Sequence, residues 1–159
     1  MARRRRRWRL AALLVGLVAT AWTVRPYRVV GSSMEPHYRE GELVWTVPLW
    51  RRPARGEVVI FEAPDGSGRS MKRVAGLPGE VPQNNFQSLQ PDPAKPPIET
   101  HASEWVLDEQ GRWSLPADHF FLLGDHLADS IDSRDFGSLR SEALLRRVLG
   151  GRRSEPSRR

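Results

Sequence analysis

Short apolar runs separated by glycine and proline dominate the chain after Gly41. The runs are rich in β-branched and aromatic residues and are too short for helices, a pattern typical of strands. Five strands are predicted, at residues 43–47, 57–61, 71–75, 105–107 and 120–123. We therefore expect a mainly β fold. The 159 residues suffice for one domain with its own apolar core.

Two later segments depart from this pattern. Residues 82–97 are rich in proline and lack periodicity, which predicts a loop within the β domain. After Gly137 the sequence SLRSEALLRRVLG has apolar residues at helical spacing. We expect the β domain to span residues 26–139, with a short helix and a disordered basic tail in residues 140–159.

An uncharged apolar segment, residues 10–24, lies near the start of the chain. As a helix it would be about 22 Å long, which is shorter than the roughly 30 Å of a bilayer's hydrocarbon core. Length alone therefore leaves open a membrane anchor, a buried core helix and a cleaved signal peptide, whose small-residue site would be residues 19–21.

Residues at the two ends of this segment favour the anchor. Trp8 and Trp22 lie where an aromatic belt would form, and Arg9 and Arg25 have side chains long enough to reach the interface. We expect one transmembrane helix at residues 10–25. The preceding arginine-rich residues 1–9 place the N-terminus in the cytoplasm and the β domain outside it.

The net charge of +6 is unevenly distributed. Residues 1–30 hold eight arginines and no acid, and residues 140–159 hold seven arginines and two glutamates. The remaining middle has 10 basic and 17 acidic residues. Because nucleic-acid-binding domains carry positive charge on the folded body, this acidic body argues against nucleic acid as a partner.

One serine and one lysine stand out as candidates for chemistry. Ser33 lies in GSSMEP, just after the apolar segment and before the first predicted strand. In isolation it would be an ordinary turn residue. A serine nucleophile needs a base, either histidine or a lysine kept neutral by burial. Lys72, one of only two lysines beside 23 arginines, lies inside a predicted strand. The alternative to a buried base is that Lys72 is an ordinary exposed lysine of this strand.

A third polar segment follows the strand predicted at residues 120–123. Its acids and hydroxyls do not have EF-hand spacing. The four histidines include no i, i+4 pair, and the chain contains no cysteine. We therefore expect neither a metal site nor a cofactor.

Four blocks in order carry a family resemblance. They are the apolar segment followed by SMEP at residues 33–36, RGEVVIF at 55–61, KRVAGLPGE at 72–80, and GD at 124–125 leading to SIDSRDFG at 130–137. The chain resembles the bacterial type I signal peptidases over residues 10–137. These are membrane-anchored serine/lysine endopeptidases with a β catalytic domain. They hydrolyse the bond between a signal peptide and an exported protein, after a small residue in Ala-x-Ala sites, through an acyl-enzyme.

This resemblance assigns a role to each matching residue. Ser33 would be the nucleophile, and its N–H one oxyanion donor. Lys72 would be the general base, held in place by the hydroxyl of Ser130. Asp132 and Arg134 would support the site, and Met34 would line the pocket for the small residue before the cleaved bond.

Some positions differ from the family's usual pattern. His37 replaces a common threonine, and His126 and Leu127 replace Asn-Arg after Gly124 and Asp125. Gly31 stands where some members have an oxyanion-hole serine, so the second oxyanion donor stays open.

Other readings compete with the serine/lysine peptidase. A Ser/His/Asp hydrolase would use Ser33, His126 and a nearby aspartate. A non-catalytic membrane-tethered β domain would bind a partner, and a related peptidase that cleaves itself or a repressor would not need the anchor. On the favoured reading the partners are preproteins and membrane lipid, and the protein is a monomer of the bacterial inner membrane. Trp45, Leu49 and Trp50 would either contact the bilayer interface or pack in the core.

Overall fold

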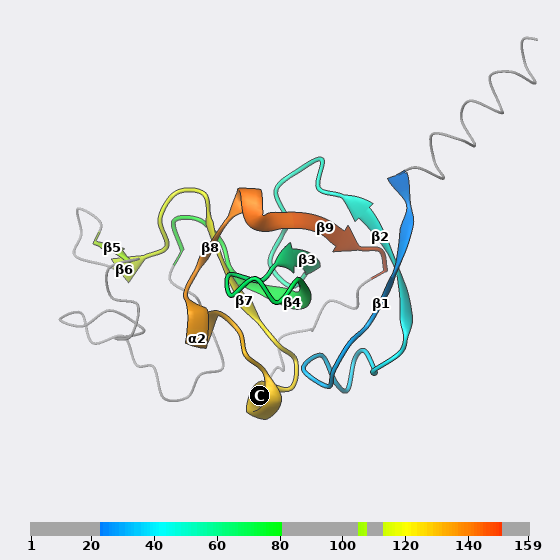
Figure 1. Ribbon diagram of the computed structural model, residues 1–159. Helices are drawn as coiled ribbons and strands as arrows, with labels where there is room; N and C mark the ends of the chain where they lie inside the picture. Colours follow the sequence, from blue (N-terminus) through cyan, green and yellow to red (C-terminus); the bar gives the residue numbers. More distant parts are fainter. Residues whose placement is uncertain (1–22, 81–104, 108–112, 151–159) are drawn as a thin grey trace, which may run out of the picture.

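An antiparallel sheet forms the body of the protein. The structure, a computed structural model, describes residues 23–80, 105–107 and 113–150. Within these residues seven strands pair in the order β1-β2-β9-β3-β4-β7-β8, and β5 and β6 form a separate pair. Figure 1 shows β1 and β2 at one side of the molecule and the β5–β6 pair at the other. The expected mainly β fold is confirmed.

The strands are β1 (Arg25–Arg28), β2 (Leu43–Pro48), β3 (Val58–Glu62), β4 (Arg69–Gly76), β5 (Val106–Leu107), β6 (Trp113–Ser114), β7 (His119–Leu123), β8 (Leu139–Arg140) and β9 (Leu144–Val148). The short helical turns are η2 (Leu127–Asp129), α2 (Ser133–Phe136) and η3 (Ser141–Ala143). All five predicted strands are present within one or two residues of their expected bounds.

The helix predicted after Gly137 is wrong, because residues 139–148 form β8, η3 and β9 instead. Strand β9 lies between β2 and β3 and pairs with both. Its buried residues Leu144 and Val148 are four positions apart, and such residues share one face in a strand as well as in a helix. The pairing available between β2 and β3 therefore makes this segment a strand rather than a helix. The β domain extends to Val148 and does not end at residue 139.

Several of the other expected boundaries lie in residues that the structure does not describe. Strand β1 begins at Arg25, which was expected to end the anchor, whereas residues 1–22 lie outside the described residues. The loop expected at 82–97 and the tail after Gly150 also lie outside them. Among the described residues, no helix is long and apolar enough to cross a membrane.

Two apolar clusters contain most of the sheet's buried side chains. One joins the β1–β2 connection to β3, β4 and β9 and includes Met34 and Tyr38. The other packs Phe61 and Phe120 beneath α2, and Leu49 lies against it. Trp45 and Trp50 are instead 58% and 70% exposed. Of the three residues considered for an apolar surface, the two tryptophans thus project from the body and Leu49 packs against its core.

Candidate active site

Ser33 lies in the turn that connects β1 to β2. Hydrogen bonds inside the turn, from Glu35 N to Ser32 O at 2.9 Å and from Tyr38 N to Met34 O at 3.0 Å, give it a compact shape. Gly31 enters the turn with φ of 77°, a left-handed conformation that glycine adopts at little cost. The turn holds Ser33 at the edge of the body, with its side chain half-buried.

Lys72 meets Ser33 from the middle of β4. The Lys72 Nζ lies 2.6 Å from the Ser33 Oγ, although the two residues are 39 positions apart. Strand β4 positions the lysine by pairing it with Val59 of β3, and the residue is only 5% exposed. A distance of 2.6 Å fits a hydrogen bond in either direction, so a neutral amine at this place would accept the serine proton.

Burial shifts the titration of this lysine. Desolvation lowers the pKa of Lys72 from its usual value of 10.5, because an ammonium group loses hydration inside the protein. Asp132 and Asp125 act in the opposite direction, and Arg134 adds to the lowering. The net direction is downward, which increases the fraction of neutral amine near neutral pH.

Asp132 and Arg134 form a tight pair beside the lysine. The Arg134 Nε donates to Asp132 Oδ1 at 2.8 Å and its Nη2 to Oδ2 at 3.0 Å, a bidentate arrangement. Asp132 is 0% exposed and also accepts from the Gly124 N–H at 3.0 Å. Hydrogen bonding holds the pKa of Asp132 low despite its burial. The carboxylate that does most to raise the pKa of Lys72 is therefore already paired with an arginine.

Ser130 lies in the same site but does not hold the lysine amine. Its hydroxyl is buried, and among the described residues neither Lys72 nor any other group makes a hydrogen bond of good geometry with it. Ser130 is still close enough to Asp132 to help lower the pKa of that carboxyl. The contact expected between Ser130 and Lys72 is thus not formed in this structure.

Met34 also differs from expectation. The side chain is 1% exposed and packs in the core cluster with Val29, Tyr38 and Ile60, so it does not line an open pocket here. The reason is the direction of the turn, which points Met34 into the sheet while Ser33 faces Lys72. The Ser33 N–H, by contrast, makes no hydrogen bond with any other described residue.

A second ion pair, which the sequence reading did not identify, supports the site. Arg73, next to Lys72, donates to both Asp125 oxygens at 2.7 and 2.6 Å, and both side chains are buried. The His37 Nδ1 lies 3.1 Å from Asp125 Oδ2. The places of Arg73 and Asp125 in two of the motif blocks were the only sequence signal, since the pair spans 52 positions.

His126 does not form a triad with Ser33. Its Nδ1 lies 3.2 Å from the Asp129 Oδ2. Its backbone N–H donates to the Ser33 carbonyl at 3.0 Å, but no side-chain contact joins the imidazole to the Ser33 hydroxyl among the described residues. The geometry favours lysine over histidine as the partner of this serine.

A family model described as "Signal peptidase, peptidase S26" matches residues 4–149. The chain belongs to this family. It is therefore a signal peptidase, a serine endopeptidase that cleaves signal peptides, and the expected family and activity are confirmed.

Two relatives in sequence agree with this assignment. Signal peptidase I of Bacillus licheniformis is 28% identical over 139 residues, covering 79% of this chain and 74% of the relative. Signal peptidase I T of Bacillus subtilis (strain 168) is 29% identical over 136 residues, covering 78% and 70%. A crystal structure of a signal peptidase I from Enterococcus faecalis V583 aligns with 59% of this signal peptidase and 94% of that chain, at 23% identity and a TM-score of 0.39.

Proposed function

We propose that this signal peptidase works through a Ser33/Lys72 dyad. The observation that carries the proposal is the 2.6 Å contact between the Ser33 hydroxyl and the buried Lys72 amine. Neutral Lys72 removes the proton from Ser33, which attacks the scissile carbonyl and forms an acyl-enzyme. The protonated lysine then gives its proton to the leaving amine, and water activated by the same lysine releases the signal peptide.

The charges around the dyad support this role for Lys72. An unpaired carboxylate beside the amine would stabilise its ammonium form and prevent it from acting as a base. Both nearby carboxylates are instead held by arginines, Asp132 by Arg134 and Asp125 by Arg73. These pairs support the site electrostatically and do not themselves exchange protons with the substrate.

A substrate in extended conformation fits the strand next to Lys72. Strand β4 pairs with β7 only from Arg73 onward, so the residues before Lys72 have one open edge among the described strands. A preprotein segment with an Ala-x-Ala site would pair with that edge through its backbone and present small side chains to the body. The Ser33 N–H would bind the oxyanion.

The same proposal places the protein in the bacterial inner membrane. Members of this family are typically membrane-anchored, and the apolar residues 10–24 with their flanking arginines have the sequence of a short anchor. The active site would then lie just outside the bilayer, where the scissile bond emerges. Exposed Trp45 and Trp50 would contact the interface.

The test is cleavage of a preprotein with an Ala-x-Ala site by the full chain in liposomes. Wild type should release the mature protein, and Ser33→Ala and Lys72→Ala should abolish release. His126→Ala serves as the matched control and should retain activity. Full activity in Lys72→Ala would refute the dyad, and loss of activity in His126→Ala would favour the triad.

A further inference from the structure

Asp125 is the point at which three parts of the active site meet. Its carboxylate receives two hydrogen bonds from Arg73, the residue that follows Lys72 on β4. Its Oδ2 also lies 3.1 Å from His37 Nδ1, on the turn that carries Ser33. One buried side chain thus contacts both the strand of the lysine and the turn of the serine.

The backbone around Asp125 touches Ser33 directly. On one side of it, the His126 N–H donates to the Ser33 carbonyl at 3.0 Å. On the other side, Gly124 packs so closely on the same carbonyl that an added Cβ would lie 2.6 Å from it. Any movement of Asp125 therefore changes the position of the serine relative to Lys72.

We propose that His37 is a positioning residue, whose charge state sets the alignment of Ser33 against Lys72 through the Asp125 carboxylate. The inference rests on the proposed function of that dyad. His37 lies four residues after Ser33, and the Tyr38 N–H bond to Met34 O makes the intervening turn compact. The turn is therefore held to the Gly124–His126 segment at two points, by the Ser33 carbonyl and by His37.

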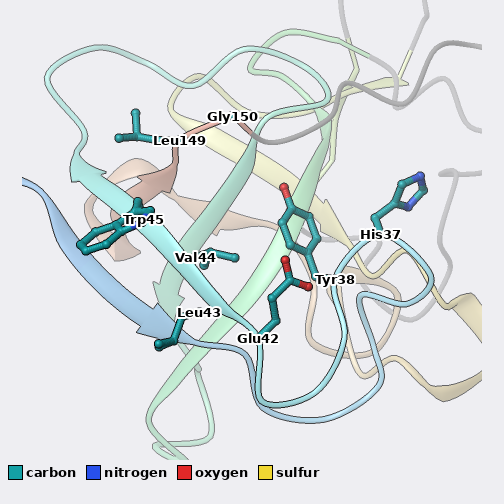
Figure 2. A pocket seen from close by; sticks show the side chains of 8 residues that line it. All are labelled: His37, Tyr38, Glu42, Leu43, Val44, Trp45, Leu149 and Gly150. Carbon is teal, nitrogen blue, oxygen red and sulfur yellow. The ribbon is translucent and has the colours of Figure 1, made fainter.

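Charged and polar groups surround the contact between His37 and Asp125. Asp125 is the nearest acid and is shared with Arg73, while Tyr38 and Glu42 line the same pocket of about 310 Å³ as His37. Figure 2 shows the His37 ring at one end of this pocket, well apart from the Glu42 carboxylate. The side chain is 36% exposed, so protons reach it from solvent.

Histidine changes charge between about pH 5 and 8. A protonated His37 forms an ion pair with Asp125 and holds the serine turn against it, whereas a neutral ring holds it less firmly. The positive imidazolium also offsets the negative charge of Asp125, which otherwise favours the charged form of Lys72 by raising its pKa. Both effects favour an aligned Ser33 and a neutral Lys72 at the acidic end of the pH range in which the enzyme works.

Steady-state preprotein cleavage by the full chain in liposomes tests the kinetic part. His37→Asn keeps a polar side chain without the charge, and His37→Arg keeps the charge at every pH. We expect His37→Asn to lower kcat about fivefold at pH 6 with KM unchanged, and the deficit to disappear near pH 8.5. His37→Arg should retain the wild-type rate at pH 6. His119→Asn, a histidine whose Nδ1 faces the Ala117 carbonyl, is the matched control and should behave as wild type. A pH-independent deficit, or none, would overturn the proposal.

A second measurement does not depend on cleavage. The chain contains two lysines, Lys72 and Lys95, so lysine labelled with ¹³C at Cε gives two signals in the full chain in detergent. We expect the Lys72 signal to move in two steps as the pH changes, the smaller of which arises from the contact between His37 and Asp125. In His37→Asn the smaller step should vanish. A smaller step that persists in this variant, or is absent from wild type, would refute the coupling. If wild type fails to cleave any preprotein, the proposed function fails while this spectrum still decides the role of His37.

Discussion

Gly124 packs closely against Ser33 and Ser130, and Gly124→Ala tests this packing. An ideal Cβ at this position would lie 2.5 Å from Ser130 Cβ and 2.6 Å from the Ser33 carbonyl oxygen. Nonbonded carbon atoms normally approach to about 3.5–4.0 Å. Neither neighbour moves freely, because Ser33 O accepts from His126 N and Ser130 is buried. The new methyl group must therefore push the serine turn and the Gly124–His126 segment apart.

This overlap converts into a large loss of stability and activity. Overpacking of a rigid site costs about 3 kcal/mol, and for a domain of this size each kcal/mol lowers Tm by about 3 °C, so Gly124→Ala should melt about 9 °C below wild type. Displacing the nucleophile by about 1 Å lowers the rate roughly 100-fold. We therefore expect kcat to fall about 100-fold at temperatures where the variant is still folded.

Calorimetry and preprotein cleavage at 20 °C check both parts. Gly66→Ala is the matched control, since its φ of 74° penalises alanine but nothing lies within 4 Å of its Cβ position. In Gly66→Ala, backbone strain alone should reduce the folding stability by about 1 kcal/mol and Tm by about 3 °C, and the activity should not change. Our reasoning is refuted if Gly124→Ala melts no lower than Gly66→Ala and cleaves at the wild-type rate.

Three further variants test the charges of the site. Burial lowers the pKa of Lys72, so the charged side chain destabilises the folded state. This loss of folding stability is fully present below the folded-state pKa and disappears as the pH rises toward 10.5. Lys72→Met should therefore unfold at higher urea concentration than wild type at pH 7, and the gap should narrow by pH 10. Arg134→Gln leaves the fully buried Asp132 without its cation; it should lose about 3–5 kcal/mol in urea unfolding. The same change raises the pKa of Lys72, so the acidic limb of the pH–rate profile should move to higher pH. His126→Ala should keep kcat within about twofold of wild type, because among the described residues Lys72 and not the His126 ring bonds the Ser33 hydroxyl; a 100-fold loss would contradict that reading.

The strands show how much of the fold can be predicted from local sequence. The residues of β3 and β7 are mostly apolar, rich in β-branched and aromatic types and bounded by turns. The bounds of these strands were therefore predicted within a residue or two. Strand β9 was missed, because its apolar residues also have the spacing of a helix. Its position between β2 and β3 supplies two sets of backbone hydrogen bonds that a helix there would leave unmade.

What the sequence by itself determined was the set of reactive groups. A serine in a turn after an apolar segment, a rare lysine in a strand and an Asp-Ser-Arg block define the family without any coordinates. These features are local, since each lies within one short stretch of chain whose residue types limit its chemistry.

Tertiary structure alone decided how these groups act on one another. The sheet brings Ser33 to Lys72 across 39 positions and Arg73 to Asp125 across 52. It buries Met34 in the core and places His37 beside Asp125. Desolvation of an amine, neutralisation of a carboxylate and the close approach of two turns depend on distances of a few ångströms, which are set by packing between strands and not by neighbours in the chain.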